Sequence, residues 1–275
     1  MGYGFSIWLR VGPARAMMRL EYKYLVPVER LSELRAMIAP FVEADVYAAQ
    51  RGLAGYTVRS IYFDTLALSF YQEKVAGLKV RRKLRLRGYN EYRRGDVVFL
   101  ETKGKYGRMI VKGRAPVRYD QVQALLASGE VERYVLTGPA FPNALEDAQR
   151  FFFYLRRGAL RPIILIVYER EAYQSRFNHA LRITFDKNLR SALFPSLDAL
   201  FQEDGHRYTM PSHLILEVKS CGGPPLWLRE IIGTLGLKPL ALSKYVLCLE
   251  AHRRPWVVTR RSMLVSSHPL VAFTC

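Results

Sequence analysis

Apolar and polar residues alternate along many short segments of the chain. A period of two is typical of β-strands that bury one face and leave the other face polar. We therefore expect strands over residues 19–26, 57–64, 79–89, 96–103, 108–117, 162–174, 181–189 and 213–220. Segments between them predict helices over residues 28–41, 65–75, 119–127, 144–157, 224–235 and 242–252. These elements place the chain in the α+β class.

One domain accounts for most of the chain. No internal repeat and no change of composition marks a boundary between residues 19 and 255. We expect a single domain over residues 19–252. Residues 1–18 are expected to be a leader, either a mis-assigned start or a disordered segment, and the tail over residues 253–275 is assigned no role.

The polar face of one predicted strand is strongly basic. Cations occupy the odd positions of residues 81–87, namely Arg81, Lys83, Arg85 and Arg87, whereas leucines occupy positions 84 and 86. Cations two residues apart on one strand face stand roughly 6.5–7 Å from each other, which costs about 2 kcal/mol per neighbouring pair at an effective dielectric of ~20. Such a row requires either solvation or an anion lying along it.

The same pattern recurs on other predicted strands. Three of them carry a glutamate and a lysine two residues apart on one face, as Glu21/Lys23, Glu101/Lys103 and Glu217/Lys219. Basic residues also occupy the polar faces of three more, at Lys112, Arg170 and Arg182. An antiparallel sheet with one wet face explains any single strand. Because basic polar faces with few carboxylates recur on many strands, we favour an antiparallel β-barrel with helices outside and a charged lumen.

Composition narrows the class of partner. The 275 residues include 42 Lys and Arg but 24 Asp and Glu, which gives a net charge of +18 and a pI of about 10.0. This excess implies an anionic partner such as nucleic acid, an anionic membrane or a phosphate-rich molecule. No apolar run approaches the ~18 residues of a transmembrane helix, so any membrane contact would be peripheral.

Cysteine spacing bears on compartment and metal. The three cysteines are far apart and form no C-x-x-C pair, so we expect neither a disulfide framework nor a zinc site. This cysteine usage fits a cytoplasmic protein.

The Glu-x-Lys pairs allow two interpretations: salt bridges within the sheet, or a site where carboxylates hold Mg²⁺ or Mn²⁺ and cations bind phosphate.

Taken together, these segments resemble the VTC domain, the polyphosphate polymerase branch of the CYTH/triphosphate tunnel metalloenzyme superfamily. The resemblance spans about residues 19–252 and rests on segments 19–24, 60–65, 83–89, 101–103, 111–114, 168–170, 181–183, 216–219 and 243–245. Arg19 stands where the CYTH type often has a glutamate, which fits the VTC branch better than a triphosphatase. A lysine typical of the family is replaced by Ala241.

The resemblance implies a polyphosphate polymerase that transfers the terminal phosphoryl group of ATP to a growing polyphosphate inside a tunnel. The residues that it implies for catalysis are Arg85, Arg87, Lys103, Arg170 and Arg182. Those that it implies for substrate binding are Arg19, Lys23, Lys83, Lys112, Lys219, Ser243 and Lys244. It also implies Glu217 as a ligand of Mn²⁺ or Mg²⁺, with Glu21 and Glu101 as further candidates.

Other activities remain open at this point. A hydrolase of triphosphate and a nucleotide cyclase would share the architecture, and a non-catalytic polyanion-binding module would share the charge. Duplex nucleic acid is too wide for such a tunnel, so ATP and polyphosphate are the expected partners.

Overall fold

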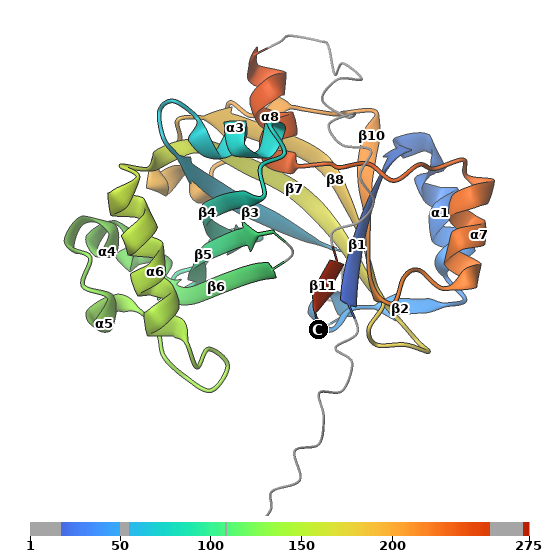
Figure 1. The fold of residues 1–275 in the computed structure, drawn as a ribbon, viewed down its shortest axis with the longest axis horizontal. Coiled ribbons are helices and arrows are strands. Elements are labelled where there is room, and N and C mark those ends of the chain that lie inside the picture. Colours follow the sequence, from blue (N-terminus) through green and yellow to red (C-terminus); the bar gives the residue numbers. More distant parts are fainter. Residues whose placement is uncertain (1–17, 50–54, 108, 254–271, 275) are drawn as a thin grey trace, which may run out of the picture.

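The computed structural model describes residues 18–49, 55–107, 109–253 and 272–274, whose strands all belong to one sheet (Figure 1). The main path of this eleven-stranded sheet runs β11-β1-β10-β8-β7-β3-β4-β5-β6, with β2 beside β7 and β9 beside β8. The strands are β1 (Met18–Pro27), β2 (Val42–Ala44), β3 (Tyr56–Asp64), β4 (Val80–Tyr89), β5 (Val97–Tyr106), β6 (Met109–Arg118), β7 (Arg161–Ser175), β8 (Arg182–Leu193), β9 (Arg207–Tyr208), β10 (His213–Cys221) and β11 (Ala272–Thr274). Every pairing is antiparallel.

Helices flank this sheet. The α-helices are α1 (Leu31–Ile38), α2 (Val46–Ala49), α3 (Ser69–Val75), α4 (Val122–Ser128), α5 (Val131–Tyr134), α6 (Ala144–Arg157), α7 (Leu226–Thr234) and α8 (Lys244–Arg253). Short 3₁₀ turns occupy Val28–Arg30, Tyr119–Gln121 and Leu197–Phe201. The expected antiparallel sheet with flanking helices is therefore confirmed.

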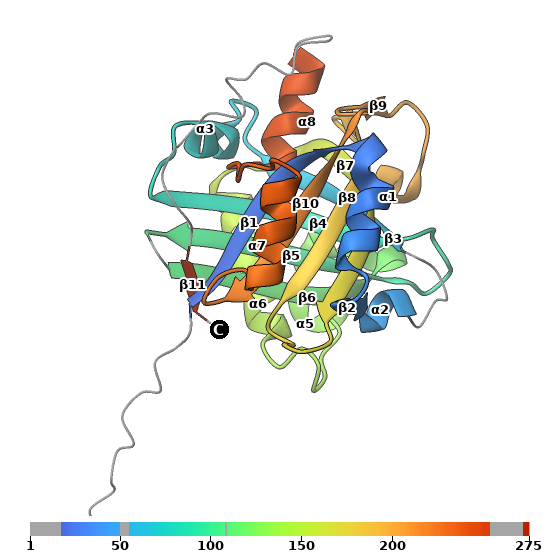
Figure 2. The ribbon, with the colours of Figure 1, turned by 90° about the vertical axis from the view of Figure 1, so that its right-hand side faces the viewer.

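Two groups of helices cover the apolar outer face of the sheet. The long helix α6 packs on β5 and β6, and its Phe151 meets Phe63 of β3 edge to face with 5.6 Å between ring centroids. Figure 2 shows α1 and α7 lying over β1, β10 and β8, where Leu34 and Leu228 share a core with Leu216. Burial of these side chains supplies the driving force for wrapping the helices around the sheet.

The helix α8 packs against the opposite, inner face. Its Tyr245 stacks on Tyr62 of β3 with 5.2 Å between centroids, and its Cys248 and Leu249 are buried with Ile166 of β7. The alternation of β3 and β7 places Tyr62 and Ile166 on the inner side. One end of the inner face is therefore apolar and covered by α8.

A buried carboxylate joins α3 and α8 to the sheet. Asp64, at the end of β3, accepts hydrogen bonds from the backbone N–H groups of Thr65, Phe70 and Tyr71 and from the Tyr245 hydroxyl at 2.6 Å. These contacts satisfy the free N–H groups at the start of α3. They also explain why the helix predicted over residues 65–75 begins at Ser69, because the turn after Asp64 occupies the first four positions, residues 65–68.

The expectation of a closed barrel is wrong. In the described part of the chain, β6 pairs with β5, β1 pairs with β10 and β11, and no ladder joins β6 to β1 or β11. The sheet instead curves so that β4–β6 and β1 face each other (Figure 1). Cations lie near both of these edges, and the charges of Lys23 and Lys219 act on Lys103. Their repulsion opposes closer approach of the two edges.

The remaining predicted elements agree closely with the structure. The predicted strands correspond to β1, β3, β4, β5, β6, β7, β8 and β10, and the helix predicted over residues 144–157 is α6. The strands β2, β9 and β11 and the helices α2 and α5 have two to four residues each, too few to show a period.

Two further findings concern the cysteines and the membrane. Cys221 is disulfide-bonded, contrary to the expectation from cysteine spacing, whereas Cys248 is a buried free thiol. Within the described residues, no helix combines the length and the apolar character needed to cross a bilayer.

Candidate functional site

The charged residues predicted to share a face do so in the structure. Residues directly paired across antiparallel strands point to the same side of the sheet. Lys23 pairs with Glu217, Lys83 with Lys103 and Arg85 with Glu101. The inner face therefore collects side chains from β1, β10, β8, β7, β3, β4, β5 and β6, although these strands come from distant parts of the chain.

Five ionised side chains, three cations and two carboxylates, form an ion-pair network on β7, β8, β10 and α8. Arg170 binds both carboxylate oxygens of Asp186, at 2.6 and 2.8 Å, and Lys244 contacts the same carboxylate at 2.5 Å. Glu217 forms an ion pair with Lys219. The carboxylates are almost fully buried, with Asp186 only 1% exposed and Glu217 5% exposed. Each buried anion therefore has a cationic partner, as burial of charge requires.

Electrostatics keep this network ionised. Burial raises the pKa of Asp186, but the charges of Arg170 and Lys244 outweigh it and hold that pKa below its ordinary value. Burial likewise raises the pKa of Glu217, and Lys219, Lys23, Lys244 and Arg170 lower it well below the usual range. The network is charged at neutral pH before any ligand binds.

Arginines surround Glu101 at the centre of β5. Its carboxylate lies 2.6 Å from Nε of Arg85, 3.4 Å from Nε of Arg114 and 3.7 Å from Nη1 of Arg87. Burial raises the pKa of Glu101, but these three charges lower it to about 2. Arg85 also donates to the Tyr62 hydroxyl at 2.9 Å. Glu101 therefore fixes the orientation of the guanidinium groups around it.

The pair on β1 joins the two sides of the site. Nζ of Lys23 lies 2.9 Å from Oε1 of Glu21 and donates to the backbone carbonyl of Leu242 at 3.3 Å. Burial lowers the pKa of Lys23, but Glu21 and Glu217 raise it above the ordinary value. This lysine is therefore held in its charged form.

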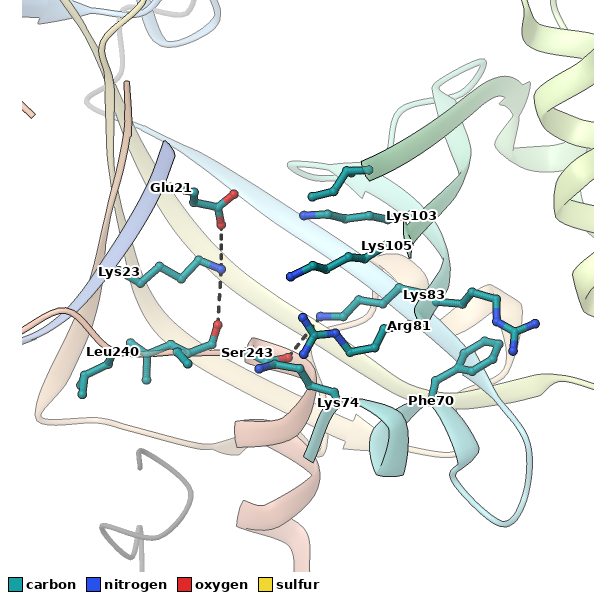
Figure 3. A pocket seen from close by; sticks show the side chains of 14 residues that line it. Glu21, Lys23, Phe70, Lys74, Arg81, Lys83, Lys103, Lys105, Leu240 and Ser243 are labelled. Carbon is teal, nitrogen blue, oxygen red and sulfur yellow. Dashed lines mark hydrogen bonds and ion pairs between the residues drawn. The ribbon is translucent and has the colours of Figure 1, made fainter. Parts of the chain in front are cut away.

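A second group of cations, the lysine cluster, faces this pair across a pocket (Figure 3). It consists of Lys74 on α3, Lys83 on β4, and Lys103 and Lys105 on β5. Lys83, Lys103 and Lys105 point into the pocket from one side and Lys23 points into it from the other. Glu21 is the single carboxylate among the residues that line this pocket. Lys74, Lys83 and Lys105 form no ion pair with any described residue, although Lys83 donates to the Ser243 hydroxyl at 3.2 Å.

Charge is poorly compensated in the lysine cluster. Burial lowers the pKa of Lys103 to about 8, with Lys23, Lys112 and Lys219 adding to the effect against the opposing charge of Glu21. Burial and the neighbouring cations also lower the pKa of Lys74 to about 8, and that of Lys83 well below its usual range. An anion placed here would relieve these repulsions.

The other predicted site residues lie at different distances from the pocket lined by the lysine cluster. Arg87 donates to the Ser60 hydroxyl at 3.1 Å, and Arg182 reaches the Asp45 carboxylate at 2.7 Å at the far end of β8. Lys112 is exposed on β6, opposite Lys103. Arg19 is the second residue of β1, and its side chain lies outside the described part of the structure. The structure thus brings most predicted residues to one face and leaves Lys112 and Arg182 towards its margins.

Sequence reasoning missed several residues of the site. Asp186 continues the even positions of Arg182 and Thr184, and Lys105 continues the odd positions of Glu101 and Lys103, so alternation alone could have found both. Tyr62, whose hydroxyl accepts from Arg85, had the same signal on β3. Lys74 lies on a short helix and had none.

Two carboxylates fit a divalent cation. Glu21 and Glu217 lie diagonally on paired strands, close enough that the charge of Glu217 raises the pKa of Glu21. No group of three or more acidic, histidine or cysteine side chains suited to a metal occurs in the described residues. A hard cation such as Mg²⁺ commonly takes one or two carboxylates and completes its shell with phosphate oxygens. The donor set therefore fits such an ion together with a phosphate ligand, whereas the arginines already engage Glu101.

Known proteins resemble this chain over most of its length. The VTC domain family matches residues 18–252. The vacuolar transporter chaperone complex subunit 4 of Schizosaccharomyces pombe is 25% identical over an alignment of 210 residues that covers 70% of this chain and 28% of that protein. The chain therefore spans little more than a quarter of the length of this relative.

Two solved structures are similar at low level. The PH1819 protein of Pyrococcus horikoshii OT3 has a TM-score of 0.41 and 13% identity, covering 85% of this chain and 99% of that one. A proposed adenylate cyclase of Vibrio parahaemolyticus has a TM-score of 0.40 and 14% identity, covering 85% of this chain and 98% of that one. TM-scores below 0.5 add nothing to the family match. Because that match covers most of the chain, this protein belongs to the VTC domain family.

Proposed function

We propose that this protein is a metal-dependent polyphosphate polymerase, which transfers the terminal phosphoryl group of ATP to a growing polyphosphate chain. The observation that carries the proposal is the convergence of arginines and lysines from most strands of the sheet, and from α3 and α8, on one inner face of a VTC domain. The proposal treats this face as the wall of a basic tunnel around the phosphate chain.

Phosphoryl transfer suits such a face. The reaction demands little covalent chemistry from the protein, but it requires in-line positioning and neutralisation of charge on the transferred group. The acceptor is a phosphate oxygen that is already ionised at neutral pH, so no general base is needed. The face supplies many cations, which agrees with the need to neutralise phosphate charge.

The carboxylates on the face hold the cations in fixed orientations. Arg85 is bound by Glu101, and Arg170 is bound through both oxygens of Asp186. A guanidinium that is already oriented pays less reorganisation when a phosphate arrives. We assign Arg85, Arg87, Lys103, Arg170 and Arg182 to neutralising the transferred phosphoryl group.

Substrate and metal binding complete the assignment. The residues proposed to hold ATP and the polyphosphate chain are Arg19, Lys23, Lys83, Lys112, Lys219, Ser243 and Lys244. Glu217, with Glu21 beside it, would hold Mn²⁺ or Mg²⁺, and Glu101 is the third candidate. When bound, the metal would neutralise charge on the phosphate oxygens.

Product analysis tests this proposal. Purified protein is incubated with ATP and Mn²⁺, and the products are separated on a gel stained for polyphosphate. The proposal predicts a polymer ladder together with ADP. Release of orthophosphate without polymer would instead identify a triphosphate hydrolase, and a cyclic nucleotide would identify a cyclase. Salt-sensitive binding of polyphosphate without any turnover would leave a polyanion-binding module.

A further inference from the structure

The cationic row of β4 continues beyond the residues assigned above. Arg81 lies two residues before Lys83 on the same strand face, one pleat repeat of roughly 6.5–7 Å farther out. In the register, Arg81 is paired with Lys105 of β5. The preceding residue of the strand, Val80, is 46% exposed, so this end of the row reaches the surface.

Lys74 of α3 completes a triad with these two residues. Lys74, Arg81 and Lys105 line the same pocket, and Figure 3 shows all three side chains directed into it. The charges of Arg81 and Lys105 act on Lys74, which confirms that the three groups are close together.

The cations of this row have fewer carboxylate partners towards the Arg81 end of β4. Arg85 and Arg87 share Glu101, whereas none of Lys74, Arg81 and Lys105 forms an ion pair with a described residue. Burial lowers the pKa of each of the three groups. Like charges lower it further for Lys74 and Lys105, whereas the charge of Glu73 partly opposes the effect of burial on Arg81. Partly buried cations that form no ion pair favour an anion at this position.

We propose that Lys74, Arg81 and Lys105 form an outer subsite that binds the phosphates of a linear polyphosphate beyond those held at the ion-pair network. The inference rests on the proposed function, because it extends the same cationic face. A triphosphate lying on the inner part of the row would leave this outer subsite empty. A longer chain would occupy both.

The remaining lining favours a chain of phosphates over nucleic acid. Phe70 is the single aromatic residue that lines the pocket, and it is only 8% exposed. Proteins that bind single-stranded nucleic acid combine a basic groove with exposed aromatic side chains on which bases stack. The outer subsite has the charge without a stacking surface, so the ligand that fits it is a polyanion without bases.

Binding measurements with two chain lengths test the outer subsite. Calorimetry is performed with tripolyphosphate and with a longer linear polyphosphate, at one salt concentration and without ATP. The test variant combines Lys74→Ala, Arg81→Ala and Lys105→Ala. We expect its affinity for the longer chain to fall roughly tenfold or more, because three cation contacts to phosphate are lost, while its affinity for tripolyphosphate changes less than about threefold.

The matched control removes three exposed arginines at the opposite end of β5 and β6, by Arg93→Ala, Arg94→Ala and Arg118→Ala. It should bind both chains nearly as the wild type does. The outer subsite would be overturned if the test variant lost affinity equally for both chain lengths or lost none for either. It would also be overturned if the control lost as much affinity for the longer chain as the test variant. Because binding is measured without turnover, the outer subsite can stand even if no polymer is made, and the two proposals fail separately.

Discussion

The ion-pair network and the lysine cluster lie on the same face, but their buried charges are in opposite electrostatic environments. In the network, Asp186 and Glu217 have cationic partners, and their pKa values are lowered so that they stay ionised. In the lysine cluster, burial and like charges lower the pKa of Lys74 and Lys103 to about 8, towards the neutral form.

This difference suggests separate roles for the two groups of side chains: one is held in place before a ligand arrives, and the other favours binding of an anion. A network whose ions already satisfy one another is rigid and contributes to the folded structure. In the lysine cluster, burial and like charges disfavour the charged forms, so the cluster costs stability until an anion binds and thereby favours binding of that anion. We infer that the network orients the reacting groups, whereas the lysine cluster attracts the polyanion. Four substitutions test this division.

The largest effect is expected for Asp186→Asn. The change leaves Arg170 and Lys244 buried without their counter-charge, and breaking a buried ion pair in this way costs about 3–5 kcal/mol. The free energy of unfolding, measured by urea denaturation, should fall by that amount. Asp120→Asn, at an exposed aspartate, is the control and should change stability by less than about 0.5 kcal/mol. A loss below about 1 kcal/mol at Asp186 would show that the network is not essential to the fold.

Glu217→Gln should act on turnover more than on stability. If Glu217 holds the metal, loss of its charge should reduce polymer synthesis roughly 100-fold or more, while polyphosphate binding stays within about threefold of the wild type. Synthesis is followed by polymer staining and binding by calorimetry. A parallel loss of binding and synthesis would indicate a structural role for Glu217 and would remove the distinction from Asp186.

Lys74→Met should have the smallest effect and the opposite sign. In the folded protein the pKa of Lys74 is about 8, below its ordinary 10.5, so the charged form destabilises the fold at neutral pH. The variant should therefore be more stable at pH 7, by an amount of order 1 kcal/mol because solvent screens this partly exposed group. Its advantage should shrink as the pH rises from about 8 to 10.5, since the folded wild type then releases the proton.

Lys23→Met provides the contrast in the same pocket. Lys23 is paired with Glu21 at 2.9 Å, and its pKa is raised. A raised pKa contributes stability that is fully present below the ordinary value of 10.5 and is lost as the pH rises through the folded value. Urea denaturation at pH 7 should therefore show a loss for Lys23→Met. Equal signs for the two variants would contradict the division into paired and unpaired cations.

The alternation of residues predicted much of this arrangement. A period of two is a local property of a strand, so it assigned Lys83, Arg85, Glu101 and Lys103 to one face without knowledge of the pairing. It extended to Lys105 and Asp186 as well, although neither was selected. It could not reach Lys74, because the orientation of a short helix depends on what it packs against.

The closing of the sheet into a barrel and the partner of each charged side chain depended on contacts between residues far apart in the sequence. The alternation suggested a closed barrel, but the described strands leave β6 and β1 unpaired with each other. The partners of single charges also stayed open, because a Glu-x-Lys pattern does not say whether an ion bonds its neighbour or a distant residue. Glu21 and Glu217 pair with the lysine two positions on, whereas Glu101 binds Arg85, Arg87 and Arg114 instead.

The sequence alone therefore determined that this protein has an antiparallel sheet with one strongly basic face, and its motifs indicated the VTC domain. Tertiary structure decided which of those charges are balanced. The carboxylate of Asp186 meets Arg170 and Lys244 because β7, β8 and α8 pack together, whereas α3 places Lys74 near other cations and in no ion pair with a described residue. Coulomb energies depend on distance and burial in space, which spacing along a chain does not fix.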